Sequence, residues 1–222
     1  MSTNTTSVWR KKLKELEIVV VIPTYNNGKT LAAVIEEVCR YADDIIVVND
    51  GSTDDTANIL EQYPAIRTIT HPVNKGKGTA LKHGLSQAKK EGFRYAITID
   101  SDGQHFASDI PCFIEAIEKE PDTLLVGARN LASDNMPGKN TFANKFSNFW
   151  FRLETGLKLE DTQSGYRLYP LRKMDVQSCW YTAKYEFELE AIVFAAWGDV
   201  AVKNISIHVY YPPQAERVSH FR

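Results

Sequence analysis

The sequence has little of what marks secreted, membrane-spanning or nucleic-acid-binding proteins. Its 26 Lys and Arg residues nearly balance 28 Asp and Glu residues, and a net charge of −2 does not indicate a polyanionic partner such as nucleic acid. The longest apolar runs, Ile18–Ile22 and Ala191–Trp197, are far shorter than the roughly 20 residues that cross a bilayer. Residues 1–16 form a polar N-terminal extension without the apolar core of a secretory signal. We therefore expect the protein to reside in the cytoplasm.

Cysteine and linker-like sequence are also scarce. The 3 cysteines, Cys39, Cys112 and Cys179, are odd in number and far apart, so neither a disulfide framework nor a zinc site is indicated. We expect them to be buried free thiols. No repeat or low-complexity linker divides the 222 residues, and 43% hydrophobic with 24% charged residues is an ordinary balance for a globular domain. The prediction is one domain that spans residues 1–222.

The first half of the chain alternates apolar segments with amphipathic ones. The apolar segments predict strands at Glu17–Pro23, Asp44–Asn49, Ala65–Thr70, Arg94–Asp100 and Asp122–Gly127. The amphipathic segments predict helices at Lys29–Tyr41, Thr53–Tyr63, Gly78–Glu91 and Ser108–Lys119, the last with Ser108 as its N-cap. Strands that are apolar almost throughout and alternate with helices are typical of a mostly parallel sheet with helices on both faces. The sequence therefore predicts an α/β fold.

This alternation stops near residue 128. A polar loop at Asn130–Lys139 precedes an aromatic-rich stretch, Phe142–Leu157, whose helical spacing fits either a core helix or a face that meets a lipid chain. The remaining predicted elements are a helix near Glu186–Trp197 and two short strands at Val200–Ile205 and Ile207–Tyr211. We interpret residues 128–222 as an extension of the same domain that closes its site.

Polar motifs follow four of the predicted strands. They are Pro23-Thr-Tyr-Asn-Asn-Gly, Asn49-Asp-Gly-Ser-Thr-Asp-Asp, His71-Pro-Val-Asn-Lys-Gly-Lys-Gly and Asp100-Ser-Asp-Gly-Gln-His. In open α/β sheets, ligands bind beyond the carboxyl ends of the strands. We therefore expect the four motifs to meet at one rim and to form the binding site.

The last of these motifs has the composition of a hard-cation site. Asp100 and Asp102 lie two residues apart where an apolar strand ends, Gly103 turns the chain, and Gln104 supplies a further oxygen. Mg²⁺ and Mn²⁺ bind such oxygen ligands and complete their coordination with water and substrate phosphates. A solvated acidic turn is the alternative, but the position at a strand exit favours the metal site.

Two further motifs suit a nucleotide. Gly76 and Lys77 lie in a glycine-rich segment that opens a helix, where backbone amides and the helix dipole favour an anion. This segment matches neither a Walker loop nor a Rossmann fingerprint, and a tight turn with exposed lysines is the alternative. Asp50 can hydrogen-bond a nucleobase or a ribose hydroxyl, or it can belong to a plain loop capped by Ser52 or Thr53.

Six sequence blocks carry a resemblance to a known family. They are Ile22-Pro-Thr-Tyr-Asn-Asn, Val48-Asn-Asp-Gly-Ser-Thr-Asp-Asp-Thr, Asn74-Lys-Gly-Lys-Gly-Thr-Ala-Leu, Asp100-Ser-Asp-Gly-Gln-His, Gly127-Ala-Arg and Asp161-Thr-Gln-Ser-Gly-Tyr-Arg. In this order they resemble the inverting family 2 glycosyltransferases of GT-A fold, and most of all the dolichyl-phosphate mannose synthase and polyprenyl-phosphate glycosyltransferase branch. The resemblance runs from about residue 17 to the C-terminus.

The resemblance implies roles for individual residues. Those expected to bind the nucleotide-sugar donor are Pro23, Tyr25, Asn26, Asp50, Gly51, Gly76, Lys77, Asp100, Ser101 and Gln163. Those expected to hold Mg²⁺ or Mn²⁺ are Asp100, Asp102 and Gln104. Those expected to act in catalysis are Arg167 on the leaving diphosphate, Arg129 on the acceptor phosphate, and the acidic residues Asp161 and Glu188. Residues 128–222 then form the acceptor side of the domain.

This resemblance implies a metal-dependent, inverting glycosyltransferase that moves a hexose from GDP-mannose or UDP-glucose to a polyprenyl or dolichyl phosphate in the synthesis of cell-envelope glycans. A phosphate acceptor is already an anion and needs no general base, whereas a hydroxyl acceptor would use Asp161 or Glu188. The alternatives are a saccharide or lipid A-like hydroxyl acceptor, and a nucleotide-sugar-binding regulator without activity. A nucleotidyltransferase would require a glycine-rich basic loop after the first strand, which Pro23-Thr-Tyr-Asn-Asn-Gly-Lys does not provide.

A lipid phosphate acceptor would place the enzyme at the cytoplasmic face of a membrane. Because no apolar stretch approaches the ~20 residues of a spanning helix, the chain needs another route to the lipid. We expect either a membrane-spanning or additional segment beyond Arg222, or weak interfacial binding by Phe142–Leu157 with Lys139, Lys145 and Arg152.

Overall fold

The structure is a computed structural model that describes residues 3–129, 152, 155–156, 158–174, 182, 184 and 186–210. At residues 3–5 and at Arg129 it describes the backbone alone. The predicted loop at Asn130–Lys139, nearly all of the aromatic stretch at Phe142–Leu157, and Cys179 lie outside the described residues. The described part includes every predicted site residue apart from the side chain of Arg129.

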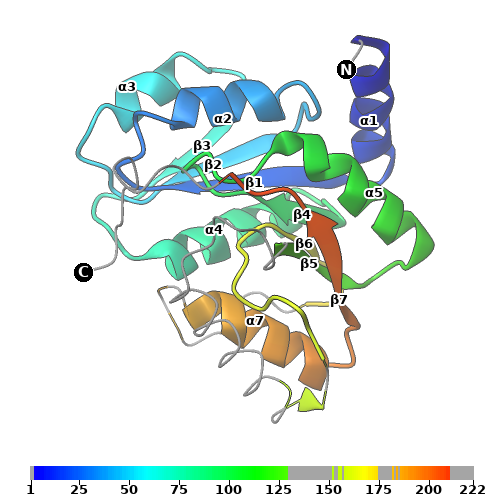
Figure 1. Cartoon of the computed structure of the whole chain (residues 1–222). Helices are drawn as coiled ribbons and strands as arrows, with labels where there is room; N and C mark the ends of the chain where they lie inside the picture. Colours follow the sequence, from blue (N-terminus) through cyan, green and yellow to red (C-terminus); the bar gives the residue numbers. More distant parts are fainter. Residues whose placement is uncertain are drawn as a thin grey trace.

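A seven-stranded sheet organises this part of the chain, in the order β3-β2-β1-β4-β6-β5-β7 (Figure 1). Its strands are β1 (Ile18–Thr24), β2 (Ile45–Asn49), β3 (Arg67–Thr70), β4 (Tyr95–Thr98), β5 (Leu124–Arg129), β6 (Arg167–Pro170) and β7 (Val202–Ile207). Neighbouring strands are parallel, except that β6 runs antiparallel to both β4 and β5. The predicted α/β fold with a mostly parallel sheet is confirmed.

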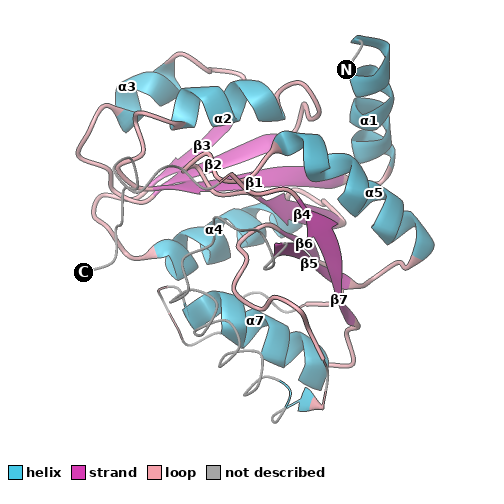
Figure 2. Cartoon of the chain, viewed as in Figure 1, coloured by secondary structure: helices cyan, strands magenta, loops and turns pink. Residues whose placement is uncertain are grey.

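Helices cover both faces of this sheet (Figure 2). They are α1 (Thr3–Glu15), α2 (Leu31–Val38), α3 (Thr56–Glu61), α4 (Lys77–Lys90), the 3-10 turn η1 (Ala107–Asp109), α5 (Ile110–Lys119) and α7 (Glu186–Trp197). Helices α2, α3 and α5 lie on one face, and α4 and α7 lie on the other. This cover explains why β1 and β2 are buried along their full length.

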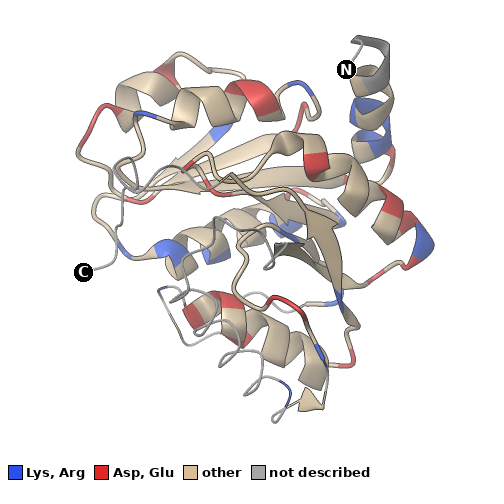
Figure 3. Ribbon diagram, in the orientation of Figure 1, with Lys and Arg blue, Asp and Glu red and all other residues tan. Residues whose placement is uncertain are grey.

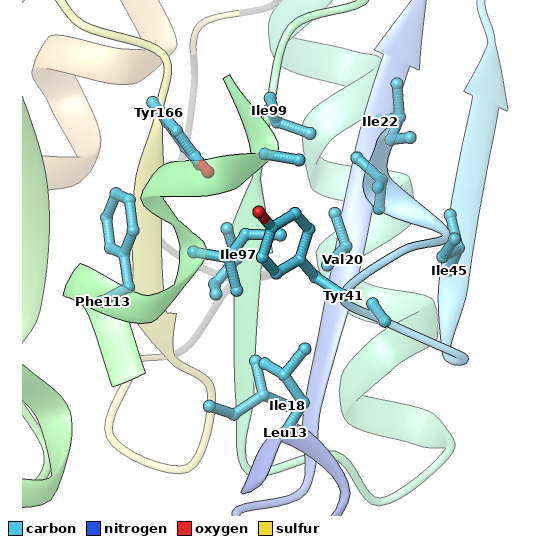
Figure 4. Packing of buried hydrophobic residues seen from close by; sticks show 14 of the residues in the cluster. Leu13, Ile18, Val20, Ile22, Tyr41, Ile45, Ile97, Ile99, Phe113 and Tyr166 are labelled. Atoms are coloured by element: carbon cyan, nitrogen blue, oxygen red, sulfur yellow. The ribbon is translucent and has the colours of Figure 1, made fainter. Parts of the chain in front are cut away.

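Alternate residues of the strands contribute to two separate cores. From β1, Ile18, Val20 and Ile22 belong to a cluster that includes residues of α2 and α5. Figure 4 shows part of this cluster. Val21 points to the opposite face and packs against α4, because side chains alternate along a strand. Gly84 allows α4 to approach closely, since a Cβ at this position would lie 2.5 Å from Val21 Cγ1. The contact fixes α4, and the glycine-rich segment before it, against the sheet.

The N-terminal residues form a helix rather than a polar extension. Leu13 of α1 is buried, and Lys12 forms an ion pair with Glu118 of α5 at 2.6 Å. Trp9 and Leu16 pack against the same core as Leu13. The helical spacing of these three apolar residues is a weak signal, because charged residues dominate the segment.

Two other local predictions are corrected by the structure. The chain forms η1 before α5, so the residue that precedes the helix is Asp109 and not Ser108. The cysteines were expected to be buried, but Cys112 is exposed and Cys39 is half-buried. Both remain free thiols, as predicted.

The second half of the sheet differs most from the prediction. The central strand β6 was not predicted, because it is short, begins with an arginine and ends in Pro170, which are unusual features for a central strand. The two strands predicted at Val200–Ile205 and Ile207–Tyr211 are a single strand, β7, followed by an isolated bridge between His105 and Val209. This bridge brings the chain after β7 to the loop that follows β4.

Candidate active site

The carboxyl ends of β1 and β4 are joined by two side chains from the segment that follows β1. Asn27 Nδ2 donates to Ser101 Oγ at 2.8 Å, and Thr30 Oγ1 donates to the Ser101 carbonyl at 2.6 Å. Ser101 itself is buried. The structure therefore gives Ser101 a role in holding the loop, and its contact with the donor stays a prediction.

Asn26 and Ser52 connect the exits of β1 and β2. The Asn26 amide donates to Ser52 Oγ at 3.0 Å, and the Thr53 amide donates to Asn26 Oδ1 at 2.8 Å. Asn26 has a φ of 52°, in the left-handed region that asparagine tolerates. Tyr25 is half-buried next to it, whereas Pro23 is buried within β1. Of these three residues predicted to bind the donor, Tyr25 and Asn26 thus lie at the rim and Pro23 lies inside the sheet.

Asp50 is buried and binds the glycine-rich segment. Its Oδ1 accepts from the Lys75 amide at 2.9 Å, and its Oδ2 accepts from the Gly76 amide at 2.8 Å. Its Oδ1 also lies 2.6 Å from His71 Nδ1. In this structure, two backbone amides of the predicted anion site therefore bind a carboxylate of the protein itself. These contacts give Asp50 a positioning role, and its contact with a base or ribose stays a prediction.

Gly51 was among the predicted site residues, whereas His71 was not. Gly51 has a φ of 69°, and a Cβ there would lie 2.4 Å from the Val73 carbonyl carbon, so only glycine allows the two loops to touch. His71 is buried, and its Nε2 lies 2.7 Å from Nδ1 of the exposed His83. A lone histidine before a proline gives no sequence signal for such a chain of contacts.

Lys77, Asp100 and Glu188 form an ionic cluster at the carboxyl end of β4. Lys77 Nζ lies 2.8 Å from Asp100 Oδ1, 3.0 Å from Asp100 Oδ2 and 3.1 Å from Glu188 Oε1. The three side chains are only 19%, 21% and 7% exposed, respectively. Figure 3 shows the basic start of α4 beside the acidic start of α7. The cluster thus joins α4, the chain after β4, and α7.

Gly165 provides the space for this cluster. A Cβ at this position would lie 2.7 Å from Asp100 Oδ2, 2.7 Å from Glu188 Oε1 and 2.8 Å from Lys77 Nζ. The Gly165 carbonyl accepts from Thr98 Oγ1 of β4 at 2.7 Å, which fixes the glycine to the sheet. It was not among the predicted site residues.

Burial and the close charges shift the pKa values of Lys77, Asp100 and Asp102. Burial alone would lower the pKa of Lys77, but attraction to Asp100 and Glu188 outweighs burial and raises that pKa. Burial would raise the pKa of Asp100, but the Lys77 charge and hydrogen bond, together with the nearby His105 and Arg167, outweigh burial, and the pKa falls. Desolvation and the neighbouring Asp100 charge raise the pKa of Asp102 to about 6. The loop therefore carries more negative charge than Lys77 neutralises.

Asp102 and Gln104 stand beside the cluster and complete the predicted metal site. Asp102 is exposed, and its Oδ1 accepts from the Gln104 amide at 2.9 Å. Within the described ranges, no group of three or more His, Cys, Asp or Glu side chains is placed to hold a metal ion. A divalent ion here would rely on two carboxylates together with water and donor phosphates, which is a common arrangement for Mg²⁺ and Mn²⁺. The residues fit such an ion, because Asp100 and Asp102 offer carboxylate oxygens at one turn and Lys77 pairs with Asp100 alone of the two.

Arg167 contacts the backbone of the cluster residue Glu188, and it is 0% exposed. Its Nε donates to the Ser164 carbonyl at 2.7 Å, its Nη2 to the Thr162 carbonyl at 3.0 Å, and its Nη1 to the Glu188 carbonyl. The guanidinium therefore fastens the turn before β6 to the start of α7. This arrangement gives Arg167 a positioning role, and its contact with a leaving diphosphate stays a prediction.

Asp161 and Gln163 form a turn that Asn204 of β7 holds in place. Asn204 Nδ2 donates to the Asp161 carbonyl at 3.0 Å and to the Val126 carbonyl at 3.1 Å. Asp161 Oδ1 accepts from the Gln163 amide at 2.9 Å, and the aspartate is buried. Gln163 is the exposed member of the turn. Asn204 was not predicted, since a single asparagine in a strand gives no functional signal.

Arg129 is the last residue of β5, and it pairs in register with Ile207 of β7. Its side chain lies outside the described residues. The contact between Arg129 and an acceptor phosphate therefore stays a prediction.

Several sequence relatives of the chain are enzymes named for sugar transfer to dolichyl phosphate or polyprenol. The UDP-N-acetylglucosamine--dolichyl-phosphate N-acetylglucosaminyltransferase of Methanococcus voltae is 30% identical over 215 residues, which cover 87% of this chain and 86% of that protein. The polyprenol monophosphomannose synthase of Mycolicibacterium smegmatis is 27% identical, over 72% of this chain and 64% of its own length. The dolichyl-phosphate beta-glucosyltransferase of Homo sapiens is 24% identical, over 91% of this chain and 69% of its own length.

Structural neighbours share the GT-A fold. The glucosyl-3-phosphoglycerate synthase of Mycobacterium tuberculosis, solved with Mn²⁺, UDP and glucosyl-3-phosphoglycerate, superposes with a TM-score of 0.69 at 20% identity, over 95% of this chain and 78% of that one. Residues 19–176, which include Asp50, Lys77, Asp100 and Arg167, match the Glycosyl transferase family 2 profile. Because this match covers most of the chain, the protein is a glycosyltransferase that belongs to Glycosyl transferase family 2.

Proposed function

We propose that this enzyme is a metal-dependent, inverting hexosyltransferase that uses a nucleoside diphosphate sugar as donor and a polyprenyl or dolichyl phosphate as acceptor. The observation that carries the proposal is the position of Asp100 and Asp102 beside Lys77, at the end of β4 where the exits of β1 and β2 are also tied. Opposite charges gathered at such a rim suit a ligand that brings both a divalent cation and a diphosphate.

On the donor side, the charged side chains would bind and orient the diphosphate. Asp100 and Asp102 would hold Mg²⁺ or Mn²⁺, which supplies positive charge against the leaving diphosphate when bound. A structural neighbour solved with Mn²⁺ and UDP supports this assignment. The donors to test are GDP-mannose, UDP-glucose and, from the name of the M. voltae relative, UDP-N-acetylglucosamine.

On the acceptor side, the names of the relatives favour a lipid phosphate, since two are named for dolichyl phosphate and one for polyprenol. A phosphate oxygen is already anionic and can attack the sugar without a general base. Glu188 pairs with Lys77, and Asp161 Oδ1 accepts from the Gln163 amide, so both candidate bases are engaged within the protein. This engagement supports a phosphate acceptor over a hydroxyl acceptor.

The same engagement supports inversion at the sugar carbon. A retaining double displacement needs a carboxylate that acts as nucleophile next to the sugar. Among the described residues, Asp100 is held by Lys77, and Asp102 by the Gln104 amide. A single displacement by the acceptor phosphate requires no such nucleophile and inverts the configuration.

Association with a membrane surface is part of this proposal and rests on the lipid acceptor. Across the described segments, no helix combines the length and the apolar character needed to cross a membrane. The prediction of interfacial binding by Phe142–Leu157 concerns residues that lie almost entirely outside the described part of the chain.

A product assay with the purified protein tests the proposal. Each donor is incubated with Mn²⁺ and either polyprenyl phosphate or the matched polyprenol, and the lipid product is identified by mass spectrometry and its anomeric configuration by NMR. We expect a hexosyl phosphate lipid of inverted configuration from the phosphate alone. Transfer to polyprenol or to a saccharide would establish a hydroxyl acceptor instead. Absence of turnover with every donor and acceptor would favour a regulator without activity.

A further inference from the structure

The Lys77 ammonium stands where a cation is expected between the acidic side chains of the site. It contacts both oxygens of Asp100, at 2.8 and 3.0 Å, and one oxygen of Glu188 at 3.1 Å. Asp102 Oδ1 instead accepts a hydrogen bond from the Gln104 backbone amide, at 2.9 Å. Lys77 thus neutralises one of the two carboxylates assigned to the divalent ion and leaves the other charged.

We propose that Lys77 is a built-in competitor of the divalent cation: it holds Asp100 in the metal-free enzyme and releases this carboxylate when the ion binds. This inference rests on the proposed metal site and concerns the order of events within it. Lys77 then acts as a positioning residue that keeps an acidic site ordered before metal and donor arrive.

The chemistry of the three side chains favours exchange over a fixed ion pair. A lysine ammonium is a compact charge on a flexible four-carbon stem, so it can leave one carboxylate without losing the other. Glu188, supplied by α7, remains as its partner, and release from Asp100 therefore leaves no buried charge unpaired. A buried charge without a partner would make the exchange far more costly.

The backbone around Lys77 is held in place, so the movement is confined to the side chain. Lys77 is the first residue of α4 and follows Gly76, whose φ of 96° marks a turn that only glycine adopts readily. Asp50 accepts from the Gly76 backbone amide, and Gly84 keeps the body of α4 against the sheet. The ammonium therefore shifts by rotation of its flexible four-carbon stem on a fixed helix.

Donor binding gives the exchange a direction. A nucleoside diphosphate that arrives with its cation brings an ion for Asp100 and, at the same time, an anion for the displaced ammonium. Without nucleotide, the displaced ammonium keeps Glu188 as its partner but gains no second anion in place of Asp100. We therefore expect weak metal binding by the free enzyme and stronger binding in the presence of UDP or GDP.

The test compares two variants that each lose one positive charge. Lys77→Met keeps most of the aliphatic chain, and Lys75→Met removes an equal charge from an exposed side chain on the same segment. Mn²⁺ binding to nucleotide-free protein is measured by calorimetry and by the EPR signal of free Mn²⁺, and thermal unfolding is followed in EDTA. Should Lys77→Met fail to fold, Lys77→Gln can hydrogen-bond to both carboxylates and takes its place.

We expect Lys77→Met to bind Mn²⁺ about tenfold or more tightly than the parent. It should unfold at a lower temperature in EDTA and regain stability when Mn²⁺ is added. Lys75→Met should change Mn²⁺ affinity by less than about threefold, because solvent screens an exposed charge.

Three results would overturn the competition. Unchanged or weaker Mn²⁺ binding by the Lys77 variant, with normal Mn²⁺ binding alongside UDP or GDP, would do so and leave the proposed metal site intact. An equal gain in Mn²⁺ affinity in the Lys77 and Lys75 variants would show that the gain comes from the change in net charge and not from the contact between Lys77 and Asp100. Absence of Mn²⁺ binding by parent and variants, with or without nucleotide, would remove both the competition and the metal dependence of the proposed function.

Discussion

Replacing Asp102 by asparagine should stabilise the metal-free protein at neutral pH, although Asp102 is proposed to bind the metal. Its pKa is raised from 3.8 to about 6 by desolvation and by the Asp100 charge. Between these two values the folded state binds more protons than the unfolded state, so stability falls as the pH rises through this window. Above pH 6 the protein carries the full cost of an ionised Asp102, and asparagine avoids that cost.

The size of this effect follows from the pKa shift. At about 1.4 kcal/mol per pH unit, the shift sets a ceiling of about 3 kcal/mol. Because Asp102 is exposed, solvent screening reduces the contribution, and we expect about 1 kcal/mol.

Urea unfolding in EDTA, at about pH 7.5 and about pH 4.5, measures the difference between Asp102→Asn and the parent. The variant should be more stable at the higher pH, and the difference should shrink at the lower pH because Asp102 becomes protonated in the parent. Asp54→Asn provides a control of opposite sign: although desolvation acts to raise its pKa, hydrogen bonds from Thr56 and Gly28 lower it, so this substitution should destabilise at the higher pH. An Asp102→Asn variant that is less stable than the parent at the higher pH, or equally stabilised at both, would refute the reasoning.

Further substitutions test other parts of the structure. Gly165→Ala places a Cβ within 2.8 Å of three charged side chains, so we expect donor affinity to fall at least about tenfold, measured by calorimetry with UDP or GDP; unchanged affinity would show that the cluster is not needed for the donor. Arg167→Lys should lower the free energy of unfolding by about 2–4 kcal/mol, because one ammonium cannot serve three buried carbonyls, and an unchanged urea midpoint would contradict this. The Asp109 carboxylate raises the pKa of His208 by a hydrogen bond and by its charge, which adds stability at low pH that is lost as the pH rises through the folded-state pKa. His208→Gln should therefore cost a few tenths of a kcal/mol near pH 5.5 and nothing near pH 8.5, whereas an equal loss at both would point to packing.

Polar site residues that come directly after a buried strand could be predicted from the sequence. The strands predicted at Glu17–Pro23 and Asp44–Asn49 nearly coincide with β1 and β2, because helices on both faces require apolar residues along their whole length. Asp100 and Asp102 stand out for the same reason, since their charges follow immediately after such a run. Local pattern is enough for features of this kind.

Contacts between distant segments could not be predicted in the same way. The partner of Lys77 on α7, Glu188, comes from the other end of the chain, and Gly165 contributes only by lacking a side chain. Asp50 binds backbone amides, which are not visible in a pattern of side chains. The resemblance implied a contact between Arg167 and the diphosphate. The burial of Arg167 and its carbonyl partners could not be predicted, because they depend on the position of β6 between β4 and β5.

Equilibrium binding of UDP and GDP, with Mn²⁺ and with EDTA, tests most directly whether the rim at the end of β4 binds a metal and a diphosphate together. We predict that at least one of the two nucleotides binds about tenfold or more tightly with Mn²⁺ than with EDTA, and that Asp102→Asn abolishes this gain. Equal binding of both nucleotides with Mn²⁺ and with EDTA, or a gain that survives in the variant, would contradict the site proposed for Asp100 and Asp102.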